Sequence, residues 1–147
     1  MSSQEPYGVS SRSVATIMIV GLGIDCEEIS RWEGLTAATV TDPRYPLFTQ
    51  SEHNFCSENP YPAQHYAGRW CLKESCVKAL ATLVTITTRD VEVLHQPDRG
   101  PAVVLIGRAA LPPDVSLIAS VTHSEKTAAA VVVAQHLGAA EGSTRLS

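Results

Sequence analysis

The stretch Arg69-Trp70-Cys71-Leu72-Lys73-Glu74-Ser75-Cys76-Val77-Lys78 decides the fold, because it forms the middle of a long helical pattern. The pattern begins after Pro62 and continues to about Val84. With about 100° per residue, apolar side chains gather in a stripe around Trp70, which a helix turns toward a core. The opposite side of the helix is also apolar, with Leu72, Cys76 and Ala79. We therefore expect this helix to be buried from two directions.

Glu74 and Lys78 interrupt the apolar stripe, since they lie at about 40° and 80° from Trp70. Two opposite charges four residues apart could form a solvated pair, which stabilises a helix by only a few tenths of a kcal/mol. If the stripe is buried, the same two charges are costly unless a partner compensates them. A metal ion together with a phosphate-bearing ligand would be such a partner.

The segments before the helix predict a strand followed by short helices. Residues Thr16 to Ile24 are β-branched and apolar, which predicts a strand buried on both faces that presents Asp25 at its carboxyl end. Asp25 could instead serve only as the N-cap of the next segment, Glu27 to Trp32, which is amphipathic. The residues Thr49-Gln50-Ser51-Glu52 have the spacing of a capping box and predict a short helix.

The segments after the helix predict two hairpins. Residues Val91 to Leu94 and Ala102 to Ile106 are strand-like and flank a turn. Ser116 to Val121 and Ala128 to Ala134 form a second pair of strands. The order of elements predicts an α+β fold in which one long helix packs on a mostly antiparallel sheet. We expect a single domain over residues 16–136, a flexible N-terminal arm over 1–15 and a frayed tail over 137–147.

The composition is that of a globular chain. The 147 residues are 44% hydrophobic and 18% charged, with a formal net charge of −4. This charge argues against general binding to nucleic acid or to a membrane surface, so any anion must be bound by a local cluster of Lys and Arg. The apolar run of Val14 to Ile24 is shorter than the roughly 20 residues that span a membrane. The four cysteines have no CxxC spacing, which favours free thiols in a reducing cytosol.

Three motifs, taken together and in this order, carry a family resemblance. The first is Gly23-Ile24-Asp25 with the following residues to Arg31, and the second is Trp70-x-x-Lys73-Glu74-x-x-x-Lys78. The third is Ser120-Val121-Thr122-His123. With these motifs the chain resembles the small holo-acyl-carrier-protein synthases, a class of 4′-phosphopantetheinyl transferases. The resemblance extends from about Val20 to Ala134.

The resemblance implies a reaction and an assembly. Such enzymes transfer 4′-phosphopantetheine from coenzyme A to a serine of an apo acyl carrier protein and release adenosine 3′,5′-bisphosphate. Members of this size commonly form homotrimers whose active sites lie between subunits. We therefore expect a cytoplasmic, magnesium-dependent enzyme with coenzyme A as its co-substrate and no nucleic-acid or membrane partner.

The resemblance also implies roles for individual residues. Asp25 and Glu74 match magnesium ligands, and Lys78 matches a lysine near the pyrophosphate and the reacting centre, which makes these three the expected catalytic residues. The expected coenzyme A site contains the residues Arg69, Lys73, Lys78, Gly100, Pro101 and His123. Arg31 matches a position that faces the acidic carrier protein.

The chemistry of the residues suits this reaction. Magnesium prefers hard oxygen ligands and commonly takes one or two carboxylates together with substrate phosphates. Lys78 lies one helical turn after Glu74 and could reach the phosphate oxygens as a point charge. The serine must lose a proton, and either Glu74 or a metal-bound water could accept it.

Two departures from the family pattern affect the coenzyme site. Residues Ala79 to Val84 contain no glycine where family members usually have a glycine-rich stretch, so the loop after Lys78 must follow a different path. Residues Asn59 to Pro62 lack the Lys-Arg cluster of some members, which leaves the 3′-phosphate to Arg69, Lys73 or a neighbouring subunit.

Two rival functions fit the same residues. Another metal-dependent phosphoryl-transfer enzyme, such as a phosphatase or nuclease, could use Asp25 and Glu74, although the chain has no basic stripe for nucleic acid. A non-catalytic module that binds carrier proteins could retain the fold, but it would have no need for the metal pair.

Overall fold

Among residues 15–138, which the computed structural model describes, five strands form two antiparallel sheets. Strands β1 (Ile17–Glu28), β5 (Thr127–Leu137) and β4 (Val115–His123) form one sheet in the order β1-β5-β4. Strands β2 (Val91–Gln96) and β3 (Gly100–Leu105) form a separate hairpin. The helices are η1 (Ile29–Trp32), α1 (Ala37–Val40), α2 (Gln50–Glu58), α3 (Pro62–Leu80) and η2 (Thr88–Asp90). The predicted α+β fold and both predicted hairpins are confirmed.

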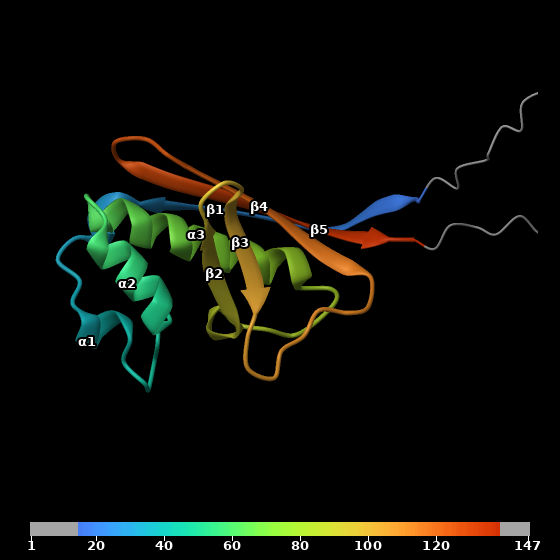
Figure 1. The fold of residues 1–147 in the computed structure, drawn as a ribbon, viewed down its shortest axis with the longest axis horizontal. Helices are drawn as coiled ribbons and strands as arrows, with labels where there is room; N and C mark the ends of the chain where they lie inside the picture. The colour runs from blue at the N-terminus through green and yellow to red at the C-terminus, as the bar shows by residue number, and fades with distance from the viewer. Residues whose placement is uncertain (1–14, 139–147) are drawn as a thin grey trace, which may run out of the picture.

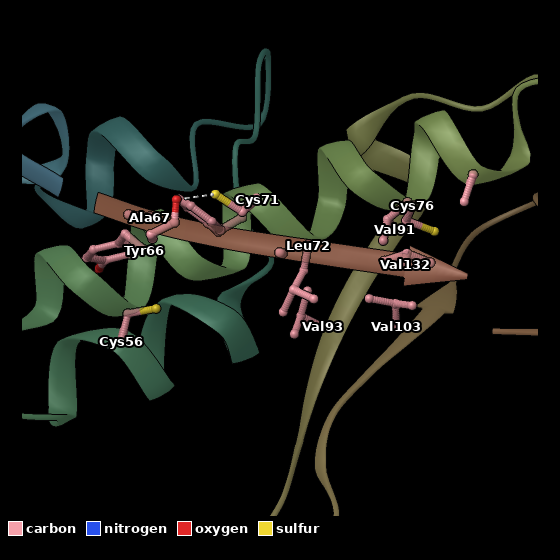
Figure 2. Close-up of a cluster of buried hydrophobic side chains, with 14 of the residues drawn as sticks. Cys56, Tyr66, Ala67, Cys71, Leu72, Cys76, Val91, Val93, Val103 and Val132 are labelled. Atoms are coloured by element: carbon pink, nitrogen blue, oxygen red, sulfur yellow. Dashed lines mark hydrogen bonds between the residues drawn. The ribbon is translucent and has the colours of Figure 1, made fainter. Parts of the chain in front are cut away.

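Helix α3 is the centre of the fold. It packs along one face of the three-stranded sheet, and the β2-β3 hairpin crosses its other side (Figure 1). Figure 2 shows Leu72 and Cys76 of α3 close to Val91 and Val93 of β2, with β5 passing over the helix. Leu72, Cys76 and Ala79 are at most 1% exposed. The sheet and the hairpin thus bury α3 from two directions, and the predicted burial of the side with Leu72, Cys76 and Ala79 is confirmed.

Strand β1 and helix α3 approach each other so closely that their backbones touch at two glycines. A Cβ atom on Gly21 would lie 1.8 Å from the carbonyl oxygen of Ala79, and one on Gly23 would lie 1.8 Å from the carbonyl oxygen of Ser75. Alternate residues of a strand share a face, so Asp25 follows the two glycines on the side that faces the helix. The close contact at the glycines thus brings the Asp25 carboxylate to α3.

A buried ion pair fastens α2 to α3. The Lys73 ammonium donates to Glu52 Oε2 at 2.7 Å, and both side chains are at most 2% exposed. Glu52 also accepts the backbone N–H of Thr49 at 2.8 Å and that of Val93 at 2.7 Å. The capping box predicted at Thr49 and Glu52 is confirmed, and its carboxylate links α2, α3 and β2 at one point.

The outer face of the three-stranded sheet, opposite α3, is apolar and open. Leu22 and Ile24 of β1 are 63% and 67% exposed, and Ile118 of β4 is 53% exposed. The prediction that β1 is buried on both faces is therefore wrong for the single chain, because a helix covers only one face of this sheet. Leu22, Val133 and Ile118 occupy one cross-strand row, so the exposed side chains form a continuous surface.

Three predicted boundaries differ from the structure. Asp25 lies within β1 and not at its end, because pairing with β5 continues to Glu28. Helix α3 ends at Leu80 and not near Val84, where tight turns replace the helical pattern. Strand β5 continues to Leu137, the first residue of the predicted tail. Residues 1–14 and 139–147, which make up nearly all of the predicted arm and tail, lie outside the described part of the chain. Within that part, no helix has the length and apolar character needed to cross a membrane.

Candidate active site

Asp25, Glu74 and Lys78 meet where β1 crosses α3. The Lys78 ammonium donates to Asp25 Oδ1 at 3.1 Å and to the backbone oxygen of Ile24 at 2.8 Å. Half of the Lys78 side chain is exposed, whereas the Asp25 side chain is only 16% exposed. The structure thus pairs Lys78 with Asp25 from the strand, whereas the helical spacing had paired it with Glu74.

The stripe around Trp70 is not the buried side of α3. Trp70, Glu74 and Val77 are half-buried and Lys78 is exposed, while the side with Leu72 and Cys76 is fully buried. The prediction of a buried Trp70 stripe is therefore wrong for the single chain. The reason is that the glycines of β1 draw the small residues of α3 against the sheet, which leaves Glu74 and Lys78 at the edge of this contact.

Glu74 is poised to change its protonation. Partial burial raises the pKa of its carboxyl group, and the neighbouring charge of Asp25 raises it further. The Lys78 ammonium acts in the opposite direction, and Glu27 adds a smaller upward effect. A carboxyl group whose pKa is raised toward the working pH can take up a proton more readily than a solvated glutamate.

The carboxylates of Asp25 and Glu74 fit a magnesium ion. Asp25 Oδ2 is buried and has no hydrogen-bond partner, so this oxygen is free to bind a ligand. Two carboxylates with no nitrogen or sulfur ligand match the preference of magnesium for hard oxygens. No cluster of three or more His, Cys, Asp or Glu ligands occurs in residues 15–138.

A second candidate site is a small groove beside the N-terminal half of α3. Its volume is about 80 Å³, and it is lined by Gln64, His65, Gly68, Arg69, Leu72, Pro101, Val121, Thr122 and His123. Three residues predicted for coenzyme A, Arg69, Pro101 and His123, thus lie together although they come from α3, β3 and β4. Gly100 begins β3 directly before Pro101 and has a φ of 75°, a conformation that favours glycine.

Arg69 lies in this groove with an uncompensated charge. Its guanidinium carbon stacks 3.6 Å from the centroid of the Phe55 ring, the residue is 8% exposed, and its Nε has no hydrogen-bond partner. Within the described residues it forms no ion pair. His65 packs against the edge of Phe55, and its pKa is lowered by burial and by the nearby charges of Arg69 and His123. An anion in the groove would relieve this concentration of positive charge.

The structure does not bring all predicted site residues together. The Lys73 ammonium is buried against Glu52 and does not line the groove, so it cannot reach a phosphate in this arrangement. Arg31 is exposed on η1 and pairs with Glu28 at 3.7 Å. Phe55 and His65 were not assigned from the sequence, because their contribution depends on contacts between α2 and α3 that no local pattern reveals.

The comparisons with known proteins agree with this arrangement. The pattern of the 4′-phosphopantetheinyl transferase superfamily matches residues 21–132 of the chain. The chain therefore belongs to this superfamily, and the transferase class and fold expected from the three sequence motifs are confirmed.

Within the superfamily, the chain is similar to holo-[acyl-carrier-protein] synthases. It is 35% identical to the synthase of Geobacter metallireducens, over 82% of this chain and 100% of the relative. The structure of the Mycobacterium tuberculosis acyl carrier protein synthase matches with 33% identity and a TM-score of 0.62, over 81% of this chain and 99% of that one. The Bacillus anthracis synthase, solved in complex with CoA (3′,5′-ADP), matches with 28% identity and a TM-score of 0.59, over 81% and 98%.

Proposed function

We propose that the protein is a magnesium-dependent holo-[acyl-carrier-protein] synthase. It transfers 4′-phosphopantetheine from coenzyme A to a serine of an apo acyl carrier protein and releases adenosine 3′,5′-bisphosphate. The observation that carries this proposal is the meeting of Asp25, Glu74 and Lys78 at the crossing of β1 and α3, where one oxygen of Asp25 is buried and unpaired. Similar synthases, including those solved with coenzyme A, support it.

Asp25 and Glu74 would hold the magnesium ion, which supplies positive charge to the pyrophosphate and to the transition state. Lys78 provides an ammonium that a phosphate can reach, because half of its side chain is exposed. The serine oxygen bonds to the phosphorus that carries pantetheine, and the bond from that phosphorus to the adenosine bisphosphate breaks. Glu74 is the chain's own candidate to accept the serine proton, since its pKa is raised.

The groove at Arg69 receives the adenosine bisphosphate part of coenzyme A. The unpaired guanidinium and the His123 imidazole offer donors to a phosphate, and Gly100 and Pro101 border the entrance. Arg69 and Glu74, however, lie about 140° apart around α3. One coenzyme molecule contacts both most readily when a neighbouring copy supplies one of them.

A homotrimer with active sites between subunits satisfies this requirement. The exposed apolar face of the three-stranded sheet, with Leu22, Ile24 and Ile118, is the surface that would be covered by another copy. Such an assembly would also give β1 the burial on both faces that its sequence predicts.

The acyl carrier protein docks near Arg31, which is exposed on η1 close to the end of β1. A positive side chain there can pair with an acidic carrier and increase the association rate. A cytoplasmic location suits the chain, because all four cysteines are free thiols and three of them are buried.

The test is to incubate the protein with coenzyme A, magnesium and an apo carrier protein, and to measure the mass of the carrier. We expect the carrier to gain one phosphopantetheine, and Asp25→Ala or Glu74→Ala to abolish the gain while circular dichroism shows a folded protein. A control variant, Asp42→Ala, removes a half-buried carboxylate that pairs with Arg44 and does not belong to the Asp25-Glu74 cluster, and it should retain activity. An unmodified carrier would refute the proposal, and full activity of the Asp25 or Glu74 variants at low magnesium would refute the metal assignment.

A further inference from the structure

A further groove lies outside the carboxylate cluster and the Arg69 groove. Its volume is about 590 Å³, and residues of η1, the beginning of α3 and the β4-β5 turn line it. The beginning of α3 and the β4-β5 turn lie at the same end of the molecule (Figure 1). A second hollow of about 480 Å³ adjoins this groove and shares Ile29, Glu33 and Glu125 with it. Neither groove has a role in the proposed reaction.

The lining of the larger groove combines aromatic rings with carboxylates. The accessible ring is that of Tyr61, which is 76% exposed, whereas Trp32 and Tyr66 line the groove but are only 9% and 2% exposed. Glu33 and Glu125 contribute the charges. No Lys or Arg lines this groove. Glu33 and Glu125 are exposed, and neither forms an ion pair with any residue in the range 15–138. Two unpaired carboxylates beside aromatic faces are complementary to a cation with a flat or aliphatic body.

The groove lies on the face of α3 that leads to the active site. Ala63 and Tyr66 line it, and Glu74 follows on the same helix. Eleven residues of helix separate Ala63 from Glu74, a distance of about 16 Å. A carrier domain of about 100 residues has a radius of gyration of about 13 Å. A carrier that places its serine at Glu74 is therefore wide enough to cover the groove.

The surface around Arg31 is also more acidic than the docking role of Arg31 suggests. Glu28 and Glu33 flank it in sequence, and Glu28 already forms an ion pair with it at 3.7 Å. A uniformly acidic carrier would be attracted by Arg31 and by the exposed Lys126 of the adjoining hollow, but it would be repelled by Glu33 and Glu125. The surface instead fits a carrier with charges of both signs.

We propose that this groove receives an arginine side chain of the cognate carrier protein. The guanidinium would lie against the exposed Tyr61 ring and donate to Glu33 and Glu125, while an acidic residue of the same carrier faces Arg31. An arginine suits the groove better than a lysine, because its planar head stacks on rings and forms paired hydrogen bonds with carboxylates. The inference rests on the proposed function, since it concerns the substrate of the same reaction.

The experiment uses a purely acidic apo carrier protein and a series of variants of it, each with one surface carboxylate near the serine replaced by arginine. kcat/KM for each carrier is measured with the wild-type enzyme, with the double variant Glu33→Gln/Glu125→Gln, and with Glu58→Gln as a control. Glu58 is an exposed glutamate at the end of α2 and does not line either groove. Calorimetric binding of the same carriers is measured in parallel and requires no turnover.

We expect at least one arginine carrier to have a kcat/KM and an affinity about fivefold higher than those of its parent. This factor corresponds to the free energy of an exposed ion pair combined with a cation–π contact. The double variant should lose this gain, and Glu58→Gln should retain it. The inference is overturned if every arginine lowers or leaves unchanged the binding and kcat/KM, or if the gain survives in the double variant. Absence of any modified carrier would refute the proposed function, whereas binding would still decide whether the groove selects arginine.

Discussion

The Lys73→Met variant should have a lower free energy of unfolding than the wild type and should bind coenzyme A equally well. Lys73 and Glu52 are at most 2% exposed and lie 2.7 Å apart. Without the ammonium, the Glu52 carboxylate stays buried with only the backbone N–H groups of Thr49 and Val93 as donors. Removal of one partner from such a pair costs about 3–5 kcal/mol. That is a large part of the roughly 5–15 kcal/mol by which a domain is stable.

The assay is urea unfolding followed by circular dichroism, together with KM for coenzyme A on the folded variant. With a slope of about 2 kcal/mol per molar urea, the midpoint should fall by roughly 2 M. Lys73→Met/Glu52→Gln should be more stable than Lys73→Met alone, because no unpaired charge remains. Lys126→Met, the same change at an exposed lysine, should alter stability by no more than about 0.5 kcal/mol. An unchanged midpoint combined with a raised KM for coenzyme A would refute the structural role and return Lys73 to the coenzyme site.

Three further predictions concern Lys78, the titration of Glu74 and the docking residue Arg31. Lys78→Met should lower kcat by about 10²–10³-fold with little loss of stability, as seen for single electrostatic stabilisers, and activity within about threefold of wild type would contradict this. In pH profiles of kcat, activity should fall with decreasing pH through a Glu74 pKa above its ordinary 4.5, since burial and Asp25 favour the protonated form. Because Lys78 opposes that shift, Lys78→Met should move the acid limb to still higher pH, and an unmoved limb would exclude Glu74 as the titrating group. Arg31→Glu should raise KM for the carrier far more than KM for coenzyme A, and equal effects on the two constants would argue against docking at Arg31.

The elements of the fold could be predicted from local patterns. Helix α3, the capping box at Thr49 and both hairpins follow from periodicity, turn residues and cap spacing, which act within a few residues. The side on which α3 is buried could not be predicted in this way. Counting apolar residues around Trp70 gives the wrong face, because burial is decided by the backbone contact of Gly21 and Gly23 with the helix. Each of these glycines alone looks like an interruption of an apolar strand.

The site could be predicted only in part, because the motifs identify the site residues but not the residues that each of them contacts in the structure. Asp25, Glu74 and Lys78 are separated in sequence yet meet in the structure. The pairing of Lys78 with Asp25 depends on the position of β1 along α3, which is set by tertiary contacts and not by the spacing of residues on the helix. A pattern of Gly-x-Gly-x-Asp in a strand, with small residues at matching turns of a helix, is the signal that could have indicated it.

Arg69 and Lys73 show why charge compensation separates binding residues from structural ones. They lie one turn apart on α3, both are buried, and sequence alone makes both candidates for a coenzyme phosphate. The charge of Lys73 is matched by Glu52, so an incoming phosphate would gain nothing from it without breaking that pair. The Arg69 guanidinium stacks on the Phe55 ring, which attracts a cation but does not neutralise its charge. Because a buried charge without a counterion is costly, the Arg69 groove favours an anionic ligand, and among these two residues the guanidinium is the group available to bind it.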